Sequence, residues 1–417
     1  MLCLLYFFSY ADRAILALLV VPIQRDLAIT DVQFGLLIGT AFAVSFSVFG
    51  VLIARYVDTR SRKWIVALGA TVWTTSTILS AFAQSYGQLL VLRLGLSIGE
   101  AVLSPAAISI IADLFPKAKR ATPTSIYTAS AAIGGSGAFL YGGWLYKAVG
   151  EDGLALPLVG ELSAWRSAMF LMGAPGLLIA FLFMLVVREP ARVAPAAEGG
   201  GDGAAASAEI RRDWRVYTGY LGCFAVMAFT SATLPAWYPT ILVREYGLDV
   251  ATSGFYYGTL GLAVGPLGIL SVPWLLARFE RHRGDDALVS LALTAILLVS
   301  PCVVVALLTP NVWLSLGLLV LVKFLLGVVN TMAYVGIQQF APNAARGRLV
   351  SYYLLAYGLC GMGLGPLTIS LISTATGLPL STALAACSVV GAGVAVALLL
   401  WARTGLRERL RGLAVQI

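Results

Sequence analysis

Residues Leu89–Pro116 read LLVLRLGLSIGEAVLSPAAISIIADLFP, and this stretch decides the fold class of the chain. It is apolar and longer than the ~20 residues that a helix needs to cross a bilayer. It nevertheless carries Arg93 and Glu100 well inside its ends. A charge at the centre of a membrane helix costs at least ~2.5–3.5 kcal/mol on insertion scales, so it is kept where it faces the protein interior. The stretch therefore predicts a membrane helix with a functional face.

Partners for these two charges must come from another helix. Arg93 and Glu100 lie on one helix face, about 10 Å apart along the axis, and are too distant to pair with each other. The first apolar segment of the chain offers Asp12 and Arg13, within the run Ser9–Arg13. We expect these four charged residues to form the working site of a membrane transporter.

The composition excludes a soluble domain. The chain has 417 residues, of which 59% are hydrophobic and 12% charged, whereas a soluble domain carries about 25% charged residues. The net charge of +8 sits in short loops, a pattern that fits anionic lipid and not nucleic acid. The five cysteines lie in apolar runs and His282 is the single histidine, so we expect no disulfide, no metal site and no cofactor.

Hydropathy predicts an all-α membrane protein with twelve transmembrane helices. The apolar segments are 2–22, 32–57, 64–83, 88–115, 122–146, 166–187, 216–242, 251–277, 286–308, 312–339, 349–373 and 381–402. Most of the 28 Lys and Arg residues lie in alternate loops and in the tail, with Arg25, Lys147, Arg166 and Arg244 on the opposite side. By the positive-inside rule, both termini face the cytoplasm.

A Gly/Ala-rich linker divides these helices six and six. We predict an N-terminal bundle over 1–187, a cytoplasmic linker over 188–213, a C-terminal bundle over 214–402 and a cytoplasmic interfacial tail over 403–417. In this tail Leu406, Leu410 and Leu413 share one helical face, with arginines around it.

The two halves also share a diverged repeat, as transporters of this size often do. Arg93 and Glu100 correspond to Lys323 and Asn330, and the spacing Pro116-x-x-x-Arg120 recurs as Pro342-x-x-x-Arg346. Both halves keep a cation, but only the first keeps carboxylates inside the membrane. Protonation chemistry should therefore sit in the N-terminal half.

The loop after the second segment, Ala54-Arg55-Tyr56-Val57-Asp58-Thr59-Arg60-Ser61-Arg62-Lys63, resembles the G-x-x-x-D-R-x-G-R-R/K signature of the major facilitator superfamily. The resemblance implies two six-helix bundles, a monomer and a cytoplasmic gate. In that gate Asp58 would brace the second helix against the start of the eleventh, where an anion is favoured. Arg62, beside Lys63, would pair with Asp113 at the end of the fourth helix.

A narrower resemblance is to the Spinster branch of that superfamily. Ser9-Tyr10-Ala11-Asp12-Arg13 is similar to its first-helix pattern N-Y-x-D-R, and Arg93-x-x-x-Ser97-x-Gly99-Glu100-Ala101 is similar to its fourth-helix pattern R-x-x-x-G-x-G-E-A. The resemblance implies transport of lysolipids or sphingoid lipids. Loop lengths typical of bacterial chains place the protein in a bacterial inner membrane.

Two interpretations of the buried charges remain open. A nearby arginine favours an ionised carboxylate and burial favours the protonated form, so Asp12 and Glu100 can couple a proton to a conformational change. The alternative is a permanent salt-bridge network that only fixes helix packing. Arg13, Arg93 and Tyr10 are candidates for substrate or switch contacts. Lys323 either lines a cavity for an anionic head group or reaches a backbone carbonyl.

Several function classes compete. The first is a proton-coupled transporter of an amphipathic or anionic organic solute by alternating access between the bundles. An uncoupled facilitator or lipid flippase, or a drug or organic-anion efflux antiporter, would use the same fold. An intramembrane enzyme is disfavoured because H-E-x-x-H, G-x-S-x-G and paired membrane Asp motifs are absent. A channel is disfavoured by the repeat and the gate sequences.

Overall fold

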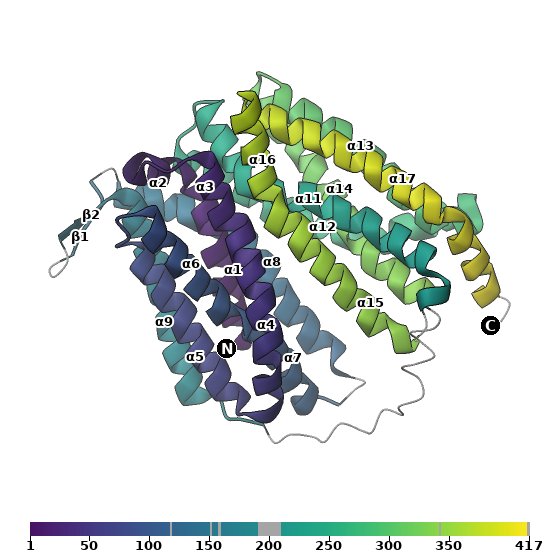
Figure 1. Ribbon diagram of the computed structural model, residues 1–417, viewed down its shortest axis with the longest axis horizontal. Helices are drawn as coiled ribbons and strands as arrows, with labels where there is room; N and C mark the ends of the chain where they lie inside the picture. The colour runs from purple at the N-terminus through teal and green to yellow at the C-terminus, as the bar shows by residue number, and fades with distance from the viewer. Residues whose placement is uncertain (117–118, 151, 157–159, 191–209, 342, 415–417) are drawn as a thin grey trace. The chain divides into compact units, whose positions relative to one another are not determined.

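The computed structural model describes residues 1–116, 119–150, 152–156, 160–190, 210–341 and 343–414, and it is helical almost throughout (Figure 1). The first part of the chain forms α1 (Leu2–Leu18), α2 (Val20–Leu27), α3 (Asp31–Gly35), the π-helical turn η1 (Leu36–Thr40), α4 (Ala41–Thr59), α5 (Arg62–Ser80), α6 (Tyr86–Ala101), α7 (Leu103–Leu114), α8 (Ala121–Val149) and α9 (Ala164–Val186). The second part forms α11 (Trp214–Arg244), α12 (Val250–Arg283), the 3₁₀ turn η3 (Gly284–Asp286), α13 (Ala287–Leu308), α14 (Val312–Phe340), α15 (Asn343–Ala356), the π-helical turn η4 (Tyr357–Gly363), α16 (Leu364–Thr376) and α17 (Leu380–Ala414).

These elements follow the twelve predicted segments. Among the described residues, eight helical stretches are long and apolar enough to cross a membrane, and the bent pair α1 and α2 makes a ninth. One of the eight, Val250–Leu308, contains both α12 and α13. Of the predicted segments, only those at α5 and α8 fall outside this set. The fold is therefore that of a polytopic helical membrane protein.

One small sheet interrupts the helical pattern. Strands β1 (Leu154–Leu156) and β2 (Gly160–Leu162) pair antiparallel between α8 and α9, with Leu154 opposite Leu162. The hydropathy pattern did not predict this hairpin, because its strands are too short to give a periodic signal.

Two of the predicted helices are broken, and proline explains both breaks. Pro22 lies four residues after Leu18, and Pro105 lies four residues after Ala101. A proline ring clashes with the carbonyl group four residues before it and cannot donate to that group. The first segment bends by 63° between α1 and α2. The fourth segment breaks at Val102, between α6 and α7, just after Glu100.

Side-chain caps fix the starts of α3 and α14. Thr30 and Gln33 form a capping box at α3, where the Gln33 backbone N–H donates to the Thr30 hydroxyl at 3.2 Å. Asn311 accepts the backbone N–H groups of Trp313 and Leu314 at the start of α14. These caps satisfy donors that have no partner within the helix.

The chain folds into two compact units. The first contains Met1–Ala194 together with Pro235–Leu262, and the second contains Pro195–Leu234 together with Ala263–Ile417. In Figure 1, the helices within Met1–Ala194 run from purple to blue, and Pro235–Leu262 is teal. The predicted bundles over 1–187 and 214–402 differ from these units in the segment Pro235–Leu262. The bundle boundaries themselves stay a prediction.

The tail begins as a continuation of the last helix. α17 runs to Ala414 without a break, and Leu406 is fully buried. Arg403 and Arg407 both pair with Asp286, with Arg403 Nη2 2.7 Å from Asp286 Oδ2. Up to Arg407, the tail therefore packs on its own unit, and its place at the membrane interface stays a prediction.

Candidate functional site

The first unit carries a group of charged side chains in its interior, on the facing sides of α1 and α6. Asp12 is 1% exposed, Arg93 5% and Glu100 2%. Arg13 is the fourth member, and its side chain is 12% exposed. The structure thus brings together the four residues that the sequence predicts for the site.

Arg13 and Glu100 form the ion pair of this group. Arg13 Nε donates to Glu100 Oε2 at 2.5 Å, so each residue supplies the membrane partner that the other needs. The pair uses one oxygen and one nitrogen. Ser9 lies near the Glu100 carboxylate, but neither Ser9 Oγ nor Glu100 Oε1 has an aligned hydrogen-bond partner among the described residues. The pair therefore leaves hydrogen-bonding capacity on Glu100.

Aromatic rings surround the Arg13 guanidinium. Its Cζ lies 4.6 Å from the ring centroids of Tyr10 and Phe42 and 5.0 Å from that of Phe46. Such cation–π contacts are stronger away from water. The rings shield the cation and give it a site that does not depend on Glu100 alone. Phe42 and Phe46, on α4, were not predicted, because aromatic spacing in a membrane helix usually indicates packing.

Asp12 has a different environment from Glu100. Neither carboxylate oxygen has an aligned hydrogen-bond partner among the described residues. Thr77 lies nearby, but its hydroxyl donates to the Trp73 carbonyl oxygen at 3.1 Å. Glu100 repels the carboxylate, whereas Arg93 and Arg13 attract it. A buried carboxyl of this kind is one of the places where perturbed protonation marks function.

Arg93 completes the group and forms no ion pair with the other residues that the structure describes. Its Cζ lies 5.0 Å from the centroid of the Phe42 ring, and its Nε has no hydrogen-bond partner among the described residues. Phe42 therefore lies against both buried arginines. The Arg93 guanidinium is positioned by packing and by the charges around it.

A hydroxyl chain joins α4 to α6 beside these charges. Ser45 Oγ and Ser97 Oγ are 2.7 Å apart, and Ser97 donates to the Phe42 carbonyl oxygen at 2.9 Å. This contact fixes Phe42 relative to Arg93. The only signal for it in the sequence is Ser97, which replaces a glycine of the Spinster pattern.

A second charged cluster lies at the start of α5, around Arg62. Arg62, 1% exposed, pairs with Asp113, as the superfamily resemblance implies, and donates to Ser109 at 2.9 Å. Its Nε also lies 2.9 Å from Glu189 Oε1. Lys63 contributes its backbone N–H, which donates to Glu189 at 2.7 Å. The side chain of Asp58 lies outside the described residues.

Glu189 is the residue of this cluster that the sequence reasoning missed. Burial on its own raises the pKa of its carboxyl, but hydrogen bonds from the Lys63 backbone and from the Arg62 and Ser61 side chains lower that pKa below its usual value. The signal for it was the position of Glu189 two residues after the sixth predicted segment, next to Pro190.

The opposite end of the first unit is held by ion pairs as well. Arg244, at the end of α11, donates to both oxygens of Asp31, at 2.8 and 2.9 Å, and to Gln24. Asp26 accepts Trp165 Nε1 at 2.8 Å and Arg166 Nε at 3.1 Å. These contacts were not predicted, since they join residues far apart in the sequence.

The second unit holds the counterparts from the repeat. Asn330 Nδ2 donates to Ser231 Oγ at 3.0 Å, joining α14 to α11. Lys323 lies two turns earlier on α14 and is partly buried. This candidate therefore belongs to a different unit from Asp12 and Glu100. Within the described residues, no group of three or more His, Cys, Asp or Glu side chains is placed to hold a metal ion.

Buried carboxylates and arginines on membrane helices are features of solute transporters. The sequence model for the major facilitator superfamily matches residues 2–366. The chain belongs to the major facilitator superfamily. It is accordingly a multi-pass integral membrane transporter, and the proteins that it matches are transporters rather than enzymes.

Similar proteins in this superfamily include several Spinster proteins. An "MFS-type efflux pump" of Mycolicibacterium smegmatis is 30% identical over 72% of this chain and 66% of its own length. "Protein spinster" of Drosophila melanogaster is 24% identical over 73% of this chain and 50% of its own length. The chain thus spans about half to two thirds of these relatives.

The solved structure of a bacterial homologue of the human lysosomal transporter Spinster, inward-facing and unoccupied, is 26% identical. It covers 98% of this chain, and the match covers 95% of that structure, with a TM-score of 0.78. The occupied form of the homologue gives a TM-score of 0.75 at 25% identity. These matches support the Spinster branch that the motifs predicted.

Proposed function

We propose that this transporter is proton-coupled and moves an amphipathic or anionic organic solute by alternating access. Asp12 and Glu100 carry the coupling proton, and Arg13, Arg93, Tyr10 and Lys323 serve the substrate or the switch. The protein works as a monomer in a bacterial plasma membrane, with both termini in the cytoplasm. A lysolipid or a sphingoid lipid is the substrate class that we favour.

The observation that carries this proposal is the incomplete pairing of the buried charges. Arg13 pairs with Glu100 through one oxygen, whereas Asp12 has no aligned donor among the described residues. A network built only for stability would satisfy its buried polar groups, because each unsatisfied group costs free energy. Unmet hydrogen-bonding capacity favours a site that exchanges protons or ligands.

The coupling step follows from charge balance. When Glu100 takes a proton, its attraction for Arg13 falls and the guanidinium becomes available to an anionic group of the substrate. When the substrate leaves, the arginine again favours the ionised carboxylate. A proton shifts the conformational equilibrium only if the two states bind it with different affinity. Movement of α1 relative to α6 would supply that difference.

The Arg62 cluster lies at the other end of the first unit. Arg62 holds Asp113 from α7 and Glu189 after α9, so it links the start of α5 to two other helices. We assign Asp58, Arg62, Lys63 and Asp113 to a cytoplasmic gate that is remade in each transport cycle. The buried cation with two carboxylate partners supports this role.

The substrate class rests on relatives. A "Sphingosine-1-phosphate transporter SPNS2" of Danio rerio is 26% identical over 66% of this chain and 56% of its own length. An amphipathic anion of this kind would match a buried arginine lined by aromatic rings. The efflux pump of Mycolicibacterium smegmatis supports a second candidate, an efflux antiporter for other organic solutes.

The test uses purified protein in liposomes, with proton movement and flux of labelled sphingosine-1-phosphate or lysophosphatidylcholine measured together. We expect lipid flux to depend on the pH gradient in the wild type. Asp12→Asn and Glu100→Gln should each lower gradient-driven flux about tenfold or more, which is the factor that ~1.4 kcal/mol of coupling represents. Glu161→Gln, an exposed carboxylate in β2, is the matched control and should behave as wild type.

Two results would overturn separate parts of the proposal. Equal flux with and without a gradient, in the wild type and in both variants, would leave an uncoupled facilitator. Proton movement driven by other organic anions but by neither lipid would retain the coupling and replace the lipid with an efflux substrate.

A further inference from the structure

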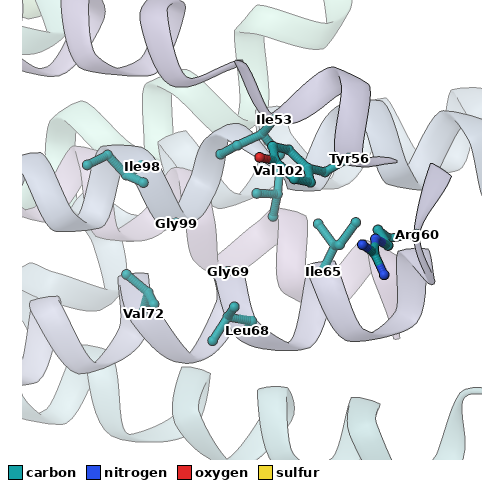
Figure 2. Close-up of a pocket in the computed structure, with 10 residues that line it drawn as sticks. All are labelled: Ile53, Tyr56, Arg60, Ile65, Leu68, Gly69, Val72, Ile98, Gly99 and Val102. Atoms are coloured by element: carbon teal, nitrogen blue, oxygen red, sulfur yellow. The ribbon is translucent and has the colours of Figure 1, made fainter. Parts of the chain in front are cut away.

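A groove of about 300 Å³ lies on the outer surface of the first unit, between α4, α5 and the α6–α7 pair. Figure 2 shows it with Arg60 at one end and Ile98 at the other. None of the residues assigned to proton coupling, substrate contact or the gate lines it. The groove is therefore distinct from the transport site.

Close helix packing forms the floor of this groove. A Cβ atom added to Gly69 on α5 would lie 2.6 Å from the Gly99 carbonyl oxygen, and one added to Gly99 would lie 2.6 Å from the Gly69 carbonyl oxygen. The two backbones are thus in direct contact, with Val102 beside them.

The walls of the groove face the bilayer. Leu68 is 67% exposed and Val72 38%, both on α5, and they lie among other aliphatic side chains. In a protein that spans a membrane, an exposed aliphatic surface on a transmembrane helix contacts hydrocarbon. The natural occupant of the apolar part is therefore a fatty acyl chain.

Arg60 and Tyr56 mark one end of an otherwise apolar groove. Arg60 is exposed there, and Tyr56, 61% exposed, lies one turn earlier on α4. Trp64 is 59% exposed just beyond, with Lys63 Nζ 5.9 Å from its ring centroid. Tyrosine and tryptophan collect where hydrocarbon meets head groups. No acidic side chain lines the groove among the described residues.

From this charge and shape complementarity we infer that the groove binds one anionic phospholipid of the surrounding bilayer. An acyl chain lies along Leu68 and Val72, and the phosphate of the head group contacts the Arg60 guanidinium. Arginine suits this role because its planar donors match phosphate oxygens. Ser61, the next residue, donates to Glu189 at 2.8 Å, so the bound lipid lies beside the Arg62 cluster. The inference does not depend on proton coupling.

The test is native mass spectrometry of delipidated protein titrated with phosphatidylglycerol or with phosphatidylcholine of the same acyl chains. We expect the first phosphatidylglycerol to bind about fivefold tighter, the factor given by ~1 kcal/mol for one basic side chain near the membrane surface. Arg60→Gln should remove this preference. Val72→Trp should fill the groove and weaken the first binding event for both lipids.

Arg281→Gln, which changes an exposed arginine at the end of α12, is the matched control and should keep the wild-type preference. Thermal unfolding in detergent checks that each variant is folded. Equal binding of both lipids by the wild type, or an unchanged preference in Arg60→Gln, would overturn the inference. Displacement of phosphatidylglycerol by excess inorganic phosphate alone would show an anion site without a lipid, and would also overturn it.

Discussion

In the first unit, α1 and α6 meet through the ion pair of Arg13 and Glu100, whereas in the second unit α11 and α14 meet through the neutral hydrogen bond of Ser231 and Asn330. Glu100 and Asn330 are the equivalent positions of the repeat. The same helix contact is therefore ionisable in one unit and uncharged in the other. This difference supports placing any protonation chemistry in the first unit.

At other equivalent positions of the repeat, the two units form the same hydrogen bonds. Arg120 donates to the carbonyl oxygens of Ala112 at 2.7 Å and Phe115 at 3.0 Å, at the end of α7. Arg346 donates to the carbonyl oxygens of Gln338 and Ala341 at the same two distances, at the end of α14. A cation at a helix C-terminus is favourable. The repeat thus preserves its helix ends and changes its interior.

The starts of α5 and α13 show a reversal of charge. In the first unit Arg62 binds two carboxylates, and in the second unit Asp286 binds two arginines. An anion at a helix start is stabilised by the helix dipole, whereas a cation there is not. Arg62 therefore depends on its carboxylate partners for stabilisation.

The largest expected effect comes from breaking the ion pair. Glu100→Gln should destabilise the protein by about 3–5 kcal/mol, because it leaves Arg13 buried without its partner. Asn330→Ala in the second unit should cost only about 1 kcal/mol, the net value of a neutral hydrogen bond. Denaturant unfolding in detergent measures both. Similar costs for the two substitutions would remove the contrast between the units.

The double variant Arg13→Gln with Glu100→Gln sharpens this comparison. Removing both charges should recover much of the lost stability, since no buried charge is left without a partner. A double variant as unstable as Glu100→Gln would show that the pair itself stabilises the fold and that an unpaired Arg13 is not the cause of the loss.

An intermediate effect is expected at the two helix ends. Arg120→Gln and Arg346→Gln should each cost about 1.5–3 kcal/mol, the range for hydrogen bonds from a charged donor. The two costs should agree, because the contacts have the same geometry. Thermal unfolding of both variants tests this, and a large difference between them would contradict the structural equivalence of the two ends.

The smallest effect concerns Glu189 and pH. Since the pKa of this carboxyl is lowered in the folded state, its contribution to stability is present above the ordinary value of 4.5 and is lost as pH falls through the lower, folded-state pKa. Unfolding curves between about pH 5 and pH 3 should therefore lose part of their pH dependence in Glu189→Gln. The side chain is 30% exposed, so the change will be small. An unaltered pH dependence would mean that Arg62 does not stabilise the Glu189 carboxylate.

The sequence predicted the helical membrane fold because about 20 apolar residues in a row have few other stable structures. It predicted that Arg93 and Glu100 need partners on another helix because charges in hydrocarbon are costly, and Asp12 and Arg13 were the available ones. It did not predict Glu189 at the Arg62 cluster or Arg244 on Asp31. Those contacts join segments far apart in the chain, and no local pattern marks them.

Sequence alone therefore determined which residues must be buried in the membrane and which of them carry charge, because hydropathy and charge are properties of each residue. Only the tertiary structure decided how the charges are shared. Arg13, and not Arg93, pairs with Glu100, while Asp12 is left without an aligned donor among the described residues. The reason is geometric: the breaks at Leu19 and Val102 and the packing of Phe42 set which side chains come within hydrogen-bond distance.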